Sequence, residues 1–168
     1  MLEGTQGREV IMANSFAEHR KTLEDRVSSI VWCSVATLDT KGRTRTRMLH
    51  PVWELDGDTP VAWIATGRQS LKAKHLEGNP YVSLTYWDPR HEQVMADCKT
   101  EWVEDMDEKQ RIWDLFKATP EPYGYDLAAF WSDVNDPTYG LLKCTPWRIE
   151  LWTVGEMSTG VPPTIWQP

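Results

Sequence analysis

Hydrophobic and polar positions along this chain alternate over short runs that are separated by turn residues. Runs rich in Val, Ile, Trp and Thr favour half-buried β-strands. They cover residues 30–38, 43–53, 61–66, 81–87, 92–103 and 139–153. Turn residues such as Asp39–Gly42 and Asp56–Asp58 separate neighbouring runs and are typical of hairpins. Pro51 lies inside the second run, where a proline predicts a break or an edge position because it cannot donate to a strand ladder.

Three stretches have the spacing of short helices instead. Residues 16–29 follow Ser15, a typical N-cap, and the stretches 70–77 and 107–117 are the other two. One further helical turn is expected near residues 127–131. This order lacks the regular strand–helix alternation of a doubly wound sheet, so it predicts mostly antiparallel strands in a barrel.

The two ends of the chain carry no such periodicity. Residues 1–14 predict a flexible arm, and the Pro-containing residues 155–168 predict an extended tail. The domain is therefore expected to cover residues 15–154.

Composition narrows the class of protein. The chain has 168 residues, enough for one domain with a sizeable core. Its ten tryptophans indicate a wide subunit interface, a flat aromatic ligand, or both. The formal net charge of −7 argues against a general nucleic-acid-binding protein, which needs a basic face.

No apolar run has the length of a membrane span, and the first residues do not resemble a secretion signal. Cys33, Cys98 and Cys144 are far apart and have no spacing typical of a metal site. A cytoplasmic protein with three reduced, buried thiols, no bound metal and no membrane partner is therefore expected.

Positive charge is concentrated in the middle of this acidic chain. Arg43, Arg45 and Arg47 are spaced two apart, which places all three on one face of a strand. Such a ladder either binds an anion or forms an exposed stripe that protects an edge strand.

The segment Thr66-Gly67-Arg68-Gln69-Ser70-Leu71-Lys72 follows a strand and opens a helix. Two hydroxyls, a lysine and a helix N-terminus could surround a phosphate. The alternative is that Ser70 only caps the helix and Lys72 is solvated. Taken together, the arginine ladder and this segment favour a site for a small anion.

Several strings in the same region carry a family resemblance: Thr-x3-Ser-x-Lys at residues 66–72, then Asn-Pro-x-Val-Ser-Leu at residues 79–84. The others are Gly42–Arg47, Pro51–Trp53, Trp63–Thr66 and Pro146–Leu151. With them the chain resembles the pyridoxamine 5′-phosphate oxidase-like superfamily of FMN-binding split β-barrels, including its general-stress-protein and actinobacterial flavin- or deazaflavin-dependent branches. The expected fold is mainly β (α+β), a six-stranded antiparallel Greek-key split β-barrel with flanking short helices.

The resemblance also implies a function. The chain would be a homodimeric FMN-binding oxidoreductase that acts on a small-molecule substrate, with the phosphate held by residues 66–72 and an arginine opposite. The implied cofactor-binding residues are Arg45, Arg47, Met48, His50, Ile64, Ala65, Thr66, Ser70, Lys72 and Gln93. A deazaflavin-dependent reductase and a non-catalytic flavin or haem binding or storage protein are the alternatives.

The chain departs from the oxidases at Leu71, where they often carry a second basic residue, a role that would shift to Arg68. His50 stands where many relatives have arginine, and it is either an acid–base group or a hydrogen-bonded structural histidine. No catalytic nucleophile is identified. Aromatic residues of the loop 118–138 could cover a ligand pocket; they are Tyr123, Tyr125, Phe130 and Trp131.

Overall fold

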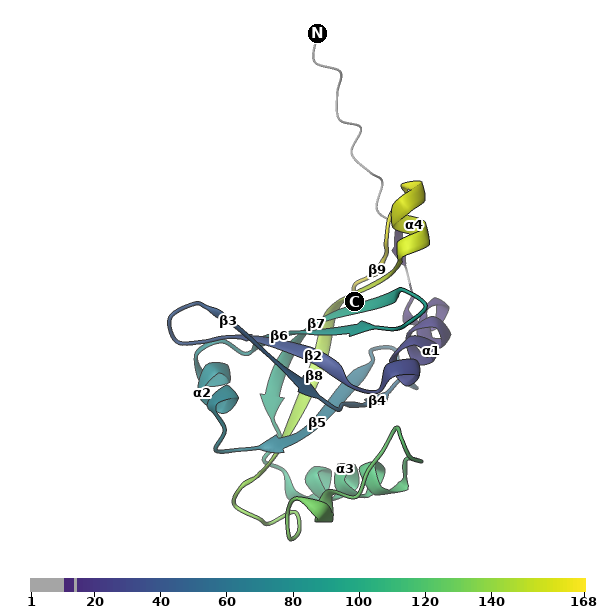
Figure 1. Ribbon diagram of the computed structural model, residues 1–168. Coiled ribbons are helices and arrows are strands. Elements are labelled where there is room, and N and C mark those ends of the chain that lie inside the picture. The colour runs from purple at the N-terminus through teal and green to yellow at the C-terminus, as the bar shows by residue number, and fades with distance from the viewer. Residues whose placement is uncertain (1–10, 14) are drawn as a thin grey trace.

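The computed structural model describes residues 11–13 and 15–168, and it has a mainly β, α+β architecture (Figure 1). The strands are β1 (Ile11–Ala13), β2 (Cys33–Leu38), β3 (Thr44–Leu49), β4 (Val52–Glu54), β5 (Val61–Gly67), β6 (Tyr81–Trp87), β7 (Glu92–Trp102), β8 (Tyr139–Thr153) and β9 (Thr164–Trp166). The helices are α1 (Arg20–Ile30), α2 (Leu71–Gly78), α3 (Met106–Ala118) and α4 (Val154–Thr159), with 3-10 turns at Phe16–Glu18 and Leu127–Ala129.

The sheet is organised around two long strands. β7 pairs antiparallel with β6 on one side and β8 on the other, and β6 continues to β2 and then β3. β8 pairs with β5 near its start and with β9 near its end, and β5 pairs with β4. Only His50 and Pro51 separate β3 from β4, which fits the missing donor of proline.

The alternation of side chains along β5 and β8 explains why these strands are apolar on both faces. On β5, Ala62 and Ile64 belong to a core shared with α1, β2, β6 and β7. Trp63 and Ala65 point to a second core, against Ile112 and other residues of α3. The two strands thus form a wall between two cores, and Figure 1 shows α3 below that wall and α2 at its side.

The predicted strands 81–87 and 139–153 are confirmed residue for residue, and three helices lie within a few residues of their predicted positions. Ser15 caps the first turn by accepting a hydrogen bond from the Ala17 amide. Two other boundaries differ. The predicted strand 30–38 begins at Cys33, because α1 runs on to Ile30 and is capped by Val31, whose φ is 65°. The run 43–53 is divided into β3 and β4.

The prediction of an extended tail is wrong for part of the segment. Residues 154–159 form α4, and residues 164–166 form β9, which pairs with β8. Of the expected N-terminal arm, residues 11–13 form β1, parallel to β9. Residues 1–10 and 14 lie outside the described residues.

Three further observations bear on the sequence-based expectations. Cys33, Cys98 and Cys144 are buried and unpaired. No helix among residues 11–13 and 15–168 combines the length and apolar character of a membrane span. Across the same residues, no cluster of His, Cys, Asp or Glu has the arrangement of a metal site.

Candidate functional site

A groove of about 460 Å³ opens beside the end of β5, and aromatic side chains form much of its lining. Its residues are Trp32, Leu49, His50, Ala65, Thr66, Gly67, Glu121, Pro122, Gly124, Tyr125, Phe130 and Trp131. We call this cavity the aromatic groove. Three of the four loop aromatics predicted to cover a pocket line it, namely Tyr125, Phe130 and Trp131. Its volume and apolar lining match those of sites for small organic ligands.

His50 lies buried in this groove between two aromatic rings. Its ring centre is 5.1 Å from that of Trp32 and 4.7 Å from that of Tyr125. Its Nε2 lies 2.9 Å from the Tyr123 carbonyl oxygen, and a carbonyl can only accept, so Nε2 carries the proton. Burial lowers the pKa of His50, although this hydrogen bond opposes the effect. The imidazole is therefore neutral at pH 7 and fastens the loop 118–138 to the β3–β4 junction.

Beside the groove, the N-terminus of α2 faces strand β3. We call the group Arg45, Arg47, Ser70 and Lys72 the basic corner. Burial lowers the pKa of Lys72, and the charge of Arg47 lowers it further, so the two cations are neighbours. Burial likewise lowers the pKa of Arg47, with a further contribution from Arg45. None of the three cations forms an ion pair with a carboxylate among the described residues.

The remaining polar groups of the corner are arranged as donors. Lys72 Nζ donates to Ser70 Oγ over 3.0 Å, which leaves the Ser70 hydroxyl proton free to donate elsewhere. Ser70 does not cap α2 with its side chain, so the first-turn amides are not satisfied by it. Arg47 Nη1 donates to the Val35 carbonyl over 3.0 Å, which orients the guanidinium. The corner is therefore suited to an anion.

The groove and the corner are continuous along the chain. Thr66 and Gly67 line the groove, and the next residues lead directly to Ser70 at the start of α2. Behind the corner, His75 Nδ1 and Thr37 Oγ1 form a buried hydrogen bond of 3.0 Å that joins α2 to β2. Lys72 thus lies beside Ser70 and Arg47, and Thr66 lies on the end of β5 that leads to Ser70.

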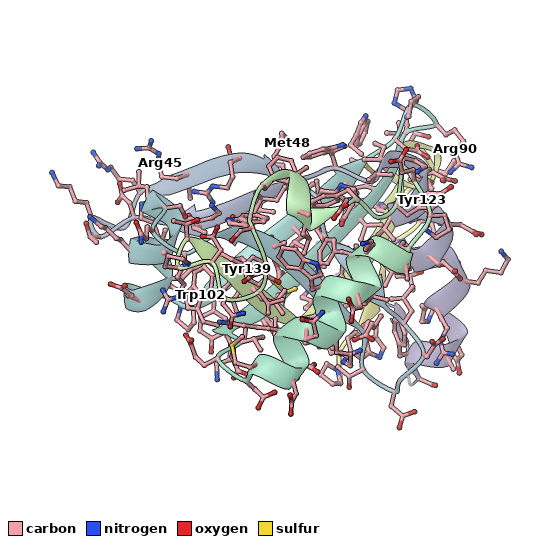
Figure 2. The ribbon with its side chains drawn as sticks, turned by 90° about the horizontal axis from the view of Figure 1, so that it is seen from below. Arg45, Met48, Arg90, Trp102, Tyr123 and Tyr139 are labelled. Carbon is pink, nitrogen blue, oxygen red and sulfur yellow. The ribbon has the colours of Figure 1, made fainter. Side chains whose placement is uncertain are left out.

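The three arginines of the ladder have different surroundings. Arg43 pairs with Asp39 over 2.7 Å and closes the β2–β3 hairpin, so it is engaged within the chain. Arg45 is exposed at the rim, and Met48 projects from the face of β3 opposite to Arg47 (Figure 2). Ile64 and Ala65 are both among the predicted cofactor-binding residues. Ala65 lines the groove, whereas Ile64 is buried in the core on the other face of β5.

Gln93 lies apart from the corner within one chain. It pairs with Trp152 near the end of β8, whereas Thr66 pairs with Gly140 near its start. The twelve residues between these two positions of β8 correspond to about 40 Å of extended strand. Along β8, Gln93 is therefore far from Thr66, whereas the pairing of β7 with β6, β6 with β2 and β2 with β3 places it closer to Arg47.

The model of the pyridoxamine 5′-phosphate oxidase family matches residues 19–152 of this chain. The chain belongs to the pyridoxamine 5′-phosphate oxidase family. The match covers every residue of the aromatic groove and of the basic corner. No curated protein sequence matches the chain significantly.

Several solved structures have the same fold at low sequence identity. A Clostridium acetobutylicum protein related to general stress protein 26 has a TM-score of 0.68 at 15% identity, covering 89% of this chain and 94% of its own. A pyridoxamine 5′-phosphate oxidase-related FMN-binding protein from Nostoc punctiforme has a TM-score of 0.62 at 16% identity, covering 86% and 87%. A haem-binding protein from Mycobacterium smegmatis has a TM-score of 0.57 at 17% identity, covering 83% and 55%.

For this member of the pyridoxamine 5′-phosphate oxidase family, sequence reasoning missed one wall of the groove. Trp32 was read as part of a strand, but the chain turns at Val31 and Trp32 lines the groove instead. A residue with positive φ other than glycine, asparagine or aspartate leaves no signal in the sequence. The cluster of aromatics in residues 118–138 was the only local hint of the opposite wall.

Proposed function

We propose that this chain is an FMN-binding oxidoreductase acting on a small molecule, with its cofactor in the aromatic groove and the basic corner. The observation that carries the proposal is the continuity of the two through Thr66 and Gly67. A ring-sized aromatic cavity leads directly to cations that have no carboxylate partner among the described residues. FMN is a flat aromatic ring joined to a phosphate, so its two parts match the two halves of the site.

The residues at the corner fit the phosphate. Two like charges, Arg47 and Lys72, are neighbours in a half-buried place, which is unfavourable until an anion lies between them. The Ser70 hydroxyl and the first-turn amides of α2 would add donors to the phosphate oxygens. These groups would bind and orient the cofactor.

The residues of the groove would hold the ring and keep water from it. Tyr125, Phe130 and Trp131 belong to the loop 118–138, and Trp32 comes from the opposite side. Bound FMN would supply the transfer of hydride or electrons, and side chains would supply binding, orientation and electrostatics. His50 would remain neutral, with its Nδ1 left as a hydrogen-bond acceptor at the groove.

We further propose that β3 and β4 act as one bent strand of a six-stranded split barrel spanning residues 15–154. The pairings of β4 with β5, β5 with β8, and β3 with β2 support this, because they make the ring of strands continuous through His50 and Pro51.

A homodimer is the proposed assembly. The outer face of β3, β2 and β6 exposes Met48, Tyr81 and Trp87 at 58%, 53% and 47% of their surfaces. Large apolar side chains in such number on one sheet face are typical of an interface. A dimer would also give Gln93 a route to the cofactor of the other subunit.

The alternatives receive less support from the same geometry. A deazaflavin has a longer anionic tail and would use Arg43, Arg68 and Lys74. Arg43 and Arg68 already form ion pairs, with Asp39 and Glu104, whereas Lys74 forms none among the described residues. Haem would need an axial histidine. His75 is buried behind the corner, whereas His50 keeps Nδ1 free at the groove within the described part of the chain, so the haemin titration below separates this alternative from FMN.

Titration of the purified protein with FMN, a deazaflavin and haemin, followed by absorption and fluorescence, tests the proposal. We expect saturable FMN binding at one per chain with a submicromolar Kd, and FMN-dependent oxidation of NADH or NADPH when an acceptor substrate is present. Binding of haemin without binding of FMN would overturn the proposal.

A further inference from the structure

A second cavity, of about 280 Å³, lies at the start of α3 and is distinct from the aromatic groove. Its lining residues are Arg68, Trp102, Val103, Glu104, Met106, Lys109, Val134, Asn135, Asp136, Pro137, Tyr139 and Gly140. We call it the α3 cavity. The two cavities are neighbours, because Gly67 lines the groove and Arg68 lines the α3 cavity.

Two polar atoms on side chains that line this cavity have no hydrogen-bond partner among the described residues. They are the indole nitrogen of Trp102 and the hydroxyl of Tyr139, whose side chains Figure 2 labels. Both atoms are inaccessible to solvent, and Tyr139 as a whole is 3% exposed. Burial of an unpaired polar group is costly, so two of them in one cavity indicate a missing partner. Because the indole N–H can only donate, that partner must accept hydrogen bonds.

The charged groups of the cavity also favour an acceptor. The guanidinium of Arg68 lies 4.4 Å from the ring centre of Trp102, which fixes its position. Arg68 and Lys109 share a single carboxylate, Glu104, at 3.5 Å and 3.9 Å. The Lys109 side chain is only 13% exposed, whereas that of Glu104 is 70% exposed, so the carboxylate lies at the solvent side.

The other carboxylate of the lining, Asp136, already accepts hydrogen bonds from its own loop. Asp136 accepts from the amide and the hydroxyl of Thr138 and from the amide of Ser132. These bonds hold the loop at the cavity, so Glu104 is the one carboxylate of the lining that pairs with the two cations, Arg68 and Lys109.

The shape of the cavity depends on one glycine. A Cβ at Gly140 would lie 2.5 Å from the Trp102 ring and 3.0 Å from the Thr66 carbonyl oxygen. The absence of a side chain there lets Trp102 lie flat against β8, where Arg68 covers it.

We propose that the α3 cavity binds a small organic anion, a carboxylate or a phosphate ester. Its oxygens would pair with Arg68 and Lys109, and on binding the side chains that cover the Trp102 indole and the Tyr139 hydroxyl would shift enough for both groups to donate to it. The volume of the cavity restricts the ligand to a molecule of a few carbon atoms. Tyr139 also packs edge-on against Trp131 of the aromatic groove, at 5.3 Å between ring centres. This site does not rest on the function proposed for the groove.

Nuclear magnetic resonance of the tryptophan indole N–H groups tests this site, with succinate and inorganic phosphate as probes. The ten tryptophans give separate indole signals, and Trp102→Phe identifies the one that belongs to Trp102. We expect a saturable shift of this signal with at least one probe, in the protein with and without FMN. The probe that binds more tightly identifies the class of anion. No saturable shift with either probe at millimolar concentrations would overturn the proposal.

Tyr139→Phe removes only the hydroxyl oxygen, so the packing of the ring is retained. We expect the affinity for the better probe to fall about tenfold, with no loss of thermal stability because the removed group is unpaired. Tyr81→Phe, at an exposed tyrosine elsewhere, is the matched control and should leave the affinity unchanged. Equal affinities in Tyr139→Phe and Tyr81→Phe would contradict the site.

Phosphate could also bind at the basic corner, so a variant separates the two places. Arg47→Ala with Lys72→Ala should leave the shift of the Trp102 signal intact. Loss of the shift in that variant would assign the anion to the corner and overturn the proposal.

Discussion

Two charged sites in this molecule contain an arginine, but the arginine has different partners in each. On α3, the guanidinium of Arg111 donates to Glu54 over 2.6 Å and to Glu108 over 2.7 Å. These bonds raise the pKa of Arg111 and lower the pKa of Glu54 and of Glu108. Every charge in this cluster has a partner within the chain, which indicates a structural role.

The basic corner has the opposite character. Arg47 and Lys72 donate to a carbonyl and a hydroxyl, and the pKa of each is lowered by burial. Each cation therefore destabilises the other in the free protein. The comparison shows that a cation paired with carboxylates of its own chain has a structural role, whereas cations without such partners form a candidate binding site.

The largest effect is expected at the corner. Arg47→Ala with Lys72→Ala removes two charge-assisted contacts to the phosphate, so the affinity for FMN should fall at least about a hundredfold. The fold should persist, because neither residue has an ion pair to lose. Fluorescence titration of FMN measures the affinity, and circular dichroism measures the fold. Lys21→Ala, which removes an exposed lysine paired with Asp25, is the control and should not change the affinity.

A smaller effect is expected in the paired cluster. Arg111→Ala should lower the free energy of unfolding by about 1 kcal/mol, a value reduced by the half-exposed position of the pair, and should leave FMN affinity unchanged. Urea denaturation measures the first quantity. A fall in FMN affinity comparable to that of the corner variant would remove the distinction between the two clusters.

The pH dependence of the stability of Arg111→Ala gives a second test of the paired cluster. The pKa values of Glu54 and Glu108 lie below 4.5 in the folded chain, so the contribution of Arg111 is present above pH 4.5 and is lost as the pH falls through the lowered values. The difference in unfolding free energy between the two proteins should therefore shrink below pH 4.5. A difference that grows on acidification would contradict the account.

The smallest expected effect has the opposite sign. Lys72→Met removes a cation whose pKa is lowered in the folded chain, so the free protein should gain stability, by less than about 1 kcal/mol because the group is half exposed. In the parent protein, stability should rise as the pH passes through the lowered pKa toward 10.5, and this rise should be absent in the variant. Thermal unfolding from neutral to alkaline pH measures both. A loss of stability would show that Lys72 has a structural role.

Local patterns predicted most of the fold. The strand 139–153 is a long run rich in apolar and aromatic residues between the polar loop 118–138 and Gly155, and its bounds are confirmed. Helix α4 and strand β9 were missed because the tail contains three prolines and few apolar residues, and β9 forms through its pairing with β8 and β1. The start of β2 was misplaced because α1 continues to a residue with positive φ, which the sequence does not reveal.

Part of the candidate site also follows from local sequence patterns, and part depends on tertiary packing. Thr66, Ser70 and Lys72 were predicted from their spacing within one segment, and they lie where that spacing indicates. The closeness of Lys72 to Arg47 depends on the packing of α2 beside β2 and β3, which no local pattern contains. The Trp102 and Tyr139 pair was not foreseen, because the two residues are far apart in sequence and join only through the register of β8.

The central claim is that the basic corner is completed by the phosphate of FMN. Riboflavin has the same ring without the phosphate, so the ratio of the two affinities isolates the corner. We expect riboflavin to bind at least about a hundredfold more weakly than FMN to the parent protein, and about equally with FMN to the Arg47→Ala and Lys72→Ala variant. Equal affinities for FMN and riboflavin in the parent protein would contradict the account.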